Sequence, residues 1–276
     1  AGSSGAKTVI TVAASAPTLY YQCSNHAGMG GQANTNSTFG SSNFGGSIQS
    51  TVSANTTAGF SIISFTSLAS GSNYTIAHGL SATPAVIFLK GRHESNNWMV
   101  YHHKNTSAPE TDYLMLDDTA ATADYPVWND TAPTSSVFSC GTWSGFDDGG
   151  TMIAYCFAEK KGFSKFGSYT GNGDADGSYI HLGFKPAFVM IKVTSTTSNW
   201  GMFDNKRLGF NPKNEFVRAN ETNTESSDYD GIDFLSNGFK LRTTSTLVNA
   251  AQSYIYMAFA ESPFVNSAGA VPTNAR

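Results

Sequence analysis

The stretch Pro84-Ala-Val-Ile-Phe-Leu-Lys90 decides the fold, because it returns further along the chain as Pro186-Ala-Phe-Val-Met-Ile-Lys192. Each copy is a short, continuous apolar run bounded by Pro and Lys, a pattern typical of a strand that is buried on both faces. The displacement is 102 residues, the distance from Pro84 to Pro186. A repeat of this length indicates that a whole structural unit has been duplicated.

The register of the repeat is kept on both sides of this stretch. Asn97-Trp98 matches Asn199-Trp200, and Phe157-Ala-Glu159 matches Phe259-Ala-Glu261 at the same displacement. Chance would not keep Asn, Trp, Phe, Ala and Glu in phase over such a distance. The sequence therefore predicts two tandem domains of one kind.

The repeat also divides the chain. We assign residues 59–161 to the first domain, and residues 162–276 to the second domain with a C-terminal tail. Since no linker separates them, we expect the two domains to pack closely. Residues 33–58 are rich in Gly, Ser, Asn and Thr and are interpreted as a linker or extended arm. Residues 1–32 form a separate N-terminal segment of strand and extended chain.

Within each copy the apolar runs are short and favour strands over helices. Residues 98–101 follow a polar turn, which predicts a hairpin, and residues 238–242 alternate with a period of two. No segment shows a sustained helical stripe with caps. We therefore predict an all-β fold of two tandem β-sandwich domains, similar to jelly rolls.

The composition of the 276 residues excludes several classes of protein. Charged residues are 13%, aromatic residues are 13%, and the net charge is −4. Disordered chains have few aromatic residues and many charges, so this chain is expected to fold. Without a cluster of Lys and Arg we expect no nucleic-acid partner. Without a long apolar run we expect no membrane span.

The three cysteines do not indicate a disulfide framework, because their number is odd and their spacing is irregular. Cys140 and Cys156 lie in apolar, strand-like runs. We expect them to be small buried side chains.

Much of the chain resembles a repeat domain of virion structural proteins of tailed phages, especially marine phages. The resemblance covers residues 59–276. The motifs that carry it are Trp128-Asn-Asp-Thr-Ala-Pro-Thr-Ser-Ser-Val-Phe138, Ala154-Tyr-Cys-Phe-Ala-Glu159, Gly162-Phe-Ser-Lys-Phe-Gly-Ser-Tyr-Thr-Gly-Asn-Gly173, Gly183-Phe-Lys-Pro-Ala-Phe-Val-Met-Ile-Lys192 and Asp233-Phe-Leu-Ser-Asn-Gly-Phe-Lys-Leu-Arg242.

This resemblance implies a non-enzymatic protein on the surface of a virion, in a tail or tail-fibre-like appendage that serves assembly, host attachment or both. It implies other virion proteins as partners. Fibre-like parts are commonly homotrimers, so a symmetric oligomer is expected. Two alternatives stay open. One is a capsid decoration protein, and the other is a secreted carbohydrate-binding adhesin with a host-surface glycan as its ligand.

The N-terminal segment Thr18-Leu-Tyr-Tyr-Gln-Cys-Ser-Asn-His-Ala-Gly-Met-Gly30 is similar to the copper-ligand loop of cupredoxins. A thiolate, an imidazole and a weak axial thioether suit copper, and Cys23, His26 and Met29 fit these roles. No second His precedes Cys23, so a missing upstream piece or a partner chain would have to complete the site. The alternative is a glycine-rich turn.

A second candidate metal site lies between two predicted strands. Asn172, Asp174 and Asp176 alternate in the way that opens a calcium loop. Gly183 stands where such a loop carries its closing Glu. A β-turn without metal is the alternative.

Aromatic residues fall into two groups. Trp98 and Trp200 recur in the repeat, so we expect them to anchor the core. Aromatic residues without a repeat partner are better candidates for exposed platforms that stack on sugar rings. These candidates are Tyr20, Tyr21, Trp128 and Trp143.

The remaining polar pairs give no indication of catalysis. We interpret His102-His103 as surface histidines, since the second copy has Asp204-Asn205 there. The pairs Asp117-Asp118 and Asp147-Asp148 are interpreted as solvated charges in turns. No Gly-x-Ser-x-Gly elbow, phosphate loop or dinucleotide fingerprint is present. The sequence therefore predicts no enzyme.

Overall fold

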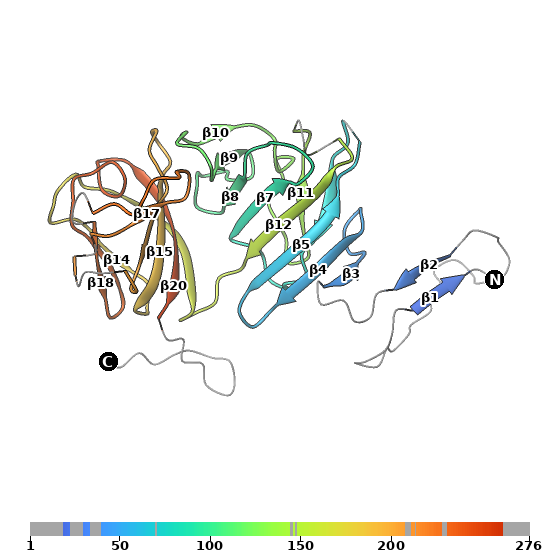
Figure 1. Cartoon of the computed structure of the whole chain (residues 1–276), viewed down its shortest axis with the longest axis horizontal. Helices are drawn as coiled ribbons and strands as arrows, with labels where there is room; N and C mark the ends of the chain where they lie inside the picture. The colour runs from blue at the N-terminus through green and yellow to red at the C-terminus, as the bar shows by residue number, and fades with distance from the viewer. Residues whose placement is uncertain are drawn as a thin grey trace.

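Every regular element that the structure describes is a β-strand, and all the strand pairs are antiparallel (Figure 1). The prediction of an all-β, β-sandwich-type fold is therefore confirmed. No helix in the described part of the chain is long and apolar enough to cross a bilayer. The structure is a computed structural model, and the residues it describes are 19–22 and 30–33 as backbone strands, 40–69, 71–143, 146, 148–207, 211–212, 214–227 and 231–261.

The strands fall into two groups, divided where the second repeat begins. Those up to that point are β1 (Leu19–Gln22), β2 (Gly30–Ala33), β3 (Ser41–Asn43), β4 (Ser50–Asn55), β5 (Phe60–Thr66), β6 (Tyr74–Ala77), β7 (Val86–Gly91), β8 (Met99–His102), β9 (Asp112–Met115), β10 (Ala123–Asp124), β11 (Val137–Cys140) and β12 (Thr151–Phe157). The later strands are β13 (Ser164–Thr170), β14 (Tyr179–His181), β15 (Pro186–Val193), β16 (Gly201–Asp204), β17 (Val217–Arg218), β18 (Ile232–Leu235), β19 (Gly238–Leu241) and β20 (Ser253–Ala260).

The sheet topology carries the same duplication as the sequence. The first large sheet has the order β10-β9-β8-β7-β12-β5-β4-β3, and the second has the order β13-β20-β15-β16-β17. Five strands correspond, because β9-β8-β7-β12-β5 repeats as β17-β16-β15-β20-β13. A smaller antiparallel pair also recurs, β6 with β11 and β14 with β19. Each repeat therefore combines one large and one small sheet.

The interpretation of residues 33–58 as a linker is wrong for residues 41–55, which form β3 and β4. Strand β4 pairs along β5 and extends the first large sheet. Ser50 and Val52 of this strand are buried. The polar composition misled the prediction because an edge hairpin with one solvated face is also rich in Ser, Thr and Asn. Upstream, β1 pairs with β2 as a separate hairpin.

Two central strands serve two cores each, because successive side chains point to opposite faces of a sheet. In β12, Met152 faces the core of the first repeat, whereas Phe157 packs against a third core. In β20, Tyr254 faces the core of the second repeat, whereas Met257 belongs to the third core. The third core contains residues of both large sheets, so these sheets pack face to face. Its buried members are Ala85, Val86, Val100, Leu114, Phe166, Met190, Trp200, Ile255 and Met257.

We call the face-to-face contact of the two large sheets, with the third core at its centre, the seam. The two repeated tryptophans are buried to different extents at the seam. Trp200 is 2% exposed, and its Nε1 donates a hydrogen bond to the carbonyl of Met115 in the other repeat, at 2.8 Å. Trp98 is half-buried and stacks on Tyr155 within its own sheet, with ring centroids 6.0 Å apart. The core-anchor prediction is therefore confirmed for Trp200, while Trp98 is only half-buried.

A buried lysine joins the repeats. The Lys192 side chain is fully buried, and its Nζ donates to the carbonyls of Thr119 at 2.9 Å and Ser198 at 2.6 Å. Desolvation lowers the pKa of Lys192 to about 8, and the nearby carboxylate of Asp118 opposes that shift. Its repeat counterpart Lys90 is half-exposed and lies 6.0 Å from the ring of Trp98. The duplicated lysine is therefore a structural bridge only in the second copy.

Replacing Lys192 should destabilise the protein far more than replacing Lys90. Lys192→Ala leaves two carbonyl acceptors without their donor and opens a cavity at the seam, which should lower the free energy of unfolding by about 2–4 kcal/mol. Lys90→Ala is the matched control and should cost about 1 kcal/mol or less, since it removes one exposed cation–π contact. Urea unfolding measures both values. Equal losses would show that Lys192 does not bridge the repeats.

The interpretation of His102-His103 as surface histidines is wrong. His102 is 1% exposed, and its Nε2 lies 3.2 Å from the carbonyl of Tyr256 in the second repeat. Its Nδ1 accepts from the amide of Lys104, so the neutral tautomer carries its proton on Nε2. His103 is half-buried, with Nε2 2.9 Å from the carbonyl of Phe166. Both histidines therefore tie the first repeat to the backbone of the second.

Acid should weaken the seam through His102. Burial, with the neighbouring charges of His103 and Lys104, lowers the pKa of His102 to about 3, below the usual 6.5. The neutral form stabilises the folded state fully above pH ~6.5, and this contribution is lost as the pH falls toward ~3. Between about pH 7 and about pH 5 it should amount to about 2 kcal/mol. His78 is also buried with a lowered pKa and acts in the same direction.

Urea unfolding of the wild type and of His102→Gln at both pH values isolates this effect. The variant should lose less stability between the two pH values than the wild type does. An identical pH dependence in the two proteins would contradict a neutral, buried His102.

Candidate functional site

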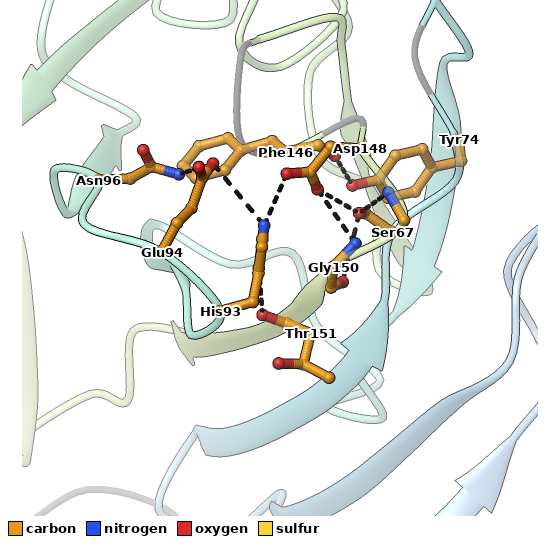
Figure 2. Close-up of polar contacts among 10 residues, drawn as sticks. Ser67, Tyr74, His93, Glu94, Asn96, Phe146, Asp148, Gly150 and Thr151 are labelled. Carbon is orange, nitrogen blue, oxygen red and sulfur yellow. Dashed lines mark hydrogen bonds and ion pairs between the residues drawn. The ribbon is translucent and has the colours of Figure 1, made fainter.

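Three loops meet at one end of the first large sheet and bring polar side chains together. Strand β12 runs antiparallel between β5 and β7, so its start lies beside the ends of those two strands. Ser67 follows β5, His93 follows β7, and Asp148 precedes β12. Figure 2 shows the carboxylates of Asp148 and Glu94 directed at the imidazole of His93, with Ser67 beside Asp148. We refer to His93, Glu94 and Asp148 as the histidine–carboxylate cluster.

Both nitrogens of the His93 ring face oxygen acceptors. Nδ1 lies 3.2 Å from the carbonyl of Thr151, and Nε2 lies 2.7 Å from Oδ2 of Asp148. Oε1 of Glu94 is 3.7 Å from the same Nε2. Because both nitrogens must donate to satisfy this arrangement, the doubly protonated ring is favoured. The hydrogen bond to Asp148 is the main cause that raises the pKa of His93.

The carboxylates are held in place by further contacts. Oδ1 of Asp148 accepts from the amide of Gly150 at 3.0 Å, and the Ser67 hydroxyl lies 3.5 Å from it. Oε1 of Glu94 accepts from the side-chain Nδ2 of Asn96 at 2.8 Å. Hydrogen bonding to His93, more than any other factor, lowers the pKa of Asp148.

A glycine makes room for the ring. A Cβ atom on Gly150 would lie 2.0 Å from Cε1 of His93, so a side chain there would displace the imidazole. The ring therefore packs directly on the backbone at the start of β12.

The cluster is not a nucleophile with its base. Ser67 is buried, and its Oγ contacts Asp148 and the carbonyl of Gly150 rather than His93. Activation of a serine needs a base within hydrogen-bond reach of its hydroxyl, which the imidazole here does not provide. One imidazole and two carboxylates are instead a ligand set for a cation.

A separate feature, a cavity, lies where the repeats meet. It is a polar cavity of about 480 Å³ beside the edge strand β13, and residues of both repeats line it. Asn105 is among them, and its side-chain Oδ1 accepts from the hydroxyl of Thr122 at 2.7 Å. Its wall mixes hydroxyl groups with the ammonium of Lys104, without a cluster of carboxylates.

Comparison with known families assigns the chain to a group. Residues 32–263 match the model of a family described as a domain of unknown function, DUF7483. The chain belongs to this family. The matched segment spans both repeats together with β3 and β4, so the family's unit is the duplicated structure. No curated protein and no solved structure matches the chain significantly.

The predicted copper ligands Cys23, His26 and Met29 lie outside the described residues. The same is true of the side chains of Tyr20 and Tyr21. The copper site therefore stays a prediction.

At the predicted calcium loop, the side-chain oxygens take part in contacts typical of turns. Oδ1 of Asn172 accepts from the amide of Asp174 at 3.1 Å, and Oδ1 of Asp174 accepts from the amide of Asp176 at 2.8 Å. Oδ1 of Asp176 forms an ion pair with Nζ of Lys240 at 2.6 Å. These contacts favour the alternative of a β-turn without metal.

The prediction that Trp128 is an exposed platform is wrong. Trp128 is 1% exposed, and its Nε1 donates to the carbonyl of Asp112 at 3.1 Å. A tryptophan without a repeat partner can fill a core that is particular to one copy. Trp143 is half-buried, with ring centroids 5.2 Å from Tyr113 and 4.8 Å from Tyr125. We call Tyr113, Tyr125 and Trp143 the aromatic group.

Sequence reasoning missed the histidine–carboxylate cluster. In the sequence, Asp148 has the pattern of a solvated turn charge, and the His93-Glu94 pair shows no sign of a site because its partner lies more than fifty residues away. The pairing of β7 with β12 is what brings them together. For Cys140 and Cys156 the prediction is confirmed, since both are buried and free.

Proposed function

We propose that this chain is a non-enzymatic structural protein of a tailed-phage virion, in a tail or tail-fibre-like appendage. It serves assembly, attachment to the host surface, or both. The observation that carries the proposal is the third core, because it packs the two large sheets of the repeats against each other in one β-unit with loops at its ends. The resemblance of residues 59–276 to virion repeat domains supports a place in a virion.

The sheet edges fit a protein that assembles in a controlled way. Exposed edges invite uncontrolled pairing with other chains unless they are covered or short. Along β13, the amide of Phe166 is bonded by a carboxylate oxygen of Glu159 at 3.3 Å, and its carbonyl lies 2.9 Å from Nε2 of His103. At the far edge of the first sheet, β3 has only three residues. Partners would then engage loops and faces, in a homotrimer and with other virion proteins.

Antibodies against the folded unit should locate the protein on the particle. Gold-labelled antibodies raised against residues 40–261 should decorate tails or fibres in electron micrographs, and light scattering of the purified chain should give a trimer. Label on the capsid lattice would instead support the decoration protein. Absence of this protein from purified particles would contradict a virion role.

A glycan-binding adhesin is the second candidate, and the aromatic group favours it. Tyr125 is 42% exposed and contacts the half-buried ring of Trp143 edge-on. Rings that are partly exposed and fixed by their neighbours suit stacking on the apolar face of a sugar. Protein of this kind would bind surface glycans without hydrolysing them.

If the aromatic group binds sugar, Tyr125→Ala should weaken binding to a host-glycan array about tenfold, because a stacking contact is lost. Tyr179→Ala is the matched control, since Tyr179 is also exposed, at 44%, but lies in the second repeat. An array without hits for the correctly assembled wild type would eliminate the adhesin.

A further inference from the structure

We propose that His93, Glu94 and Asp148 form a binding site for one divalent cation of the Zn²⁺ type. The ligand atoms of these three residues all lie within 4.8 Å of one another. Zn–N and Zn–O bonds are about 2.0–2.2 Å long, so donors of one ion lie at most about 4.4 Å apart. A small rotation of these exposed side chains would therefore bring all three donors onto a single ion. The inference stands apart from the virion role and does not depend on it.

Each of the three ligands already has the outer contact that a metal ligand needs. A metal-binding imidazole usually donates its other N–H to a carbonyl, as Nδ1 of His93 does to Thr151. Asp148 is held by the amide of Gly150, and Glu94 by Asn96 (Figure 2). The ring, the carboxylates and their supports therefore form a preorganised site rather than a chance gathering of charges.

The donor types select the class of ion. An imidazole nitrogen suits Zn²⁺, Co²⁺ or Ni²⁺, whereas Ca²⁺ and Mg²⁺ prefer oxygen ligands alone. Two carboxylates and a neutral imidazole carry a charge of −2, which a divalent cation neutralises. On binding, the ion replaces the proton on Nε2 of His93, and this proton is released to solvent. Water completes the coordination on the exposed side.

A bound ion would add a link between two loops that the hydrogen bond from His93 to Asp148 already connects. His93 and Glu94 lie in the loop after β7, and Asp148 lies in the loop before β12. Binding to the folded state alone stabilises it by mass action. The first repeat should therefore resist thermal unfolding better when the ion is present.

Calorimetric titration of Zn²⁺ into chelator-treated protein tests the site. Cys23 and His26 could also hold zinc, so the titration uses a Cys23→Ser, His26→Gln background. One ion per chain should bind and raise the melting temperature, while equimolar Mg²⁺ should do neither. His93→Gln should weaken zinc binding at least about tenfold. The matched control His181→Gln, an exposed histidine of the second repeat, should bind as the background does.

Gly150→Ala provides a second variant that keeps all three ligands. Its methyl group displaces the imidazole, so zinc affinity should fall although no donor atom is lost. Co²⁺ should give visible absorption bands in the background protein that disappear in His93→Gln. Circular dichroism of metal-free His93→Gln should match the background, which excludes misfolding. Zinc affinity unchanged in His93→Gln, or no binding in the background protein, would overturn the proposal.

Discussion

The packing of one large sheet on the other is the interaction on which the rest of this structure depends. A β-sandwich needs one apolar face per sheet, but here both faces of β12 and β20 are apolar. A large sheet with a second apolar face would expose a patch too large for a stable monomer. The two repeats solve this by covering each other, which fixes their relative position and makes the duplicated chain a single unit.

Duplication supplied identical residues, and the seam then used them unequally. Trp200 inserts into the third core while Trp98 stays half-buried, and Lys192 is buried while Lys90 is half-exposed. Asp204 stands where the first repeat has His102. Two copies packed face to face without exact symmetry place equivalent residues in different surroundings.

How much was predictable from the sequence follows from how local each signal is. The all-β class, the repeat and the buried cysteines could be predicted, because alternation, apolar runs and register are properties of short segments. Strand β4 could not be predicted, because a strand near the sheet edge with one solvent-exposed face has the amino-acid composition of a linker. Trp128 was misplaced because burial depends on what the rest of the fold packs against it.

The candidate site could not be predicted from the sequence for a related reason. His93 and Asp148 are brought together only by the pairing of β7 with β12, and no local pattern encodes that contact. The prediction of a surface position fails for His102 because its burial comes from the second repeat. In each case the missing information was long-range strand and sheet pairing.

Differential scanning calorimetry tests the central claim, that the third core makes the two repeats one cooperative unit. Our account predicts a single transition whose van't Hoff enthalpy equals its calorimetric enthalpy, because neither repeat can unfold without exposing the face that it shares. Two separate transitions, or a van't Hoff enthalpy near half the calorimetric value, would show that the repeats fold independently and would contradict it.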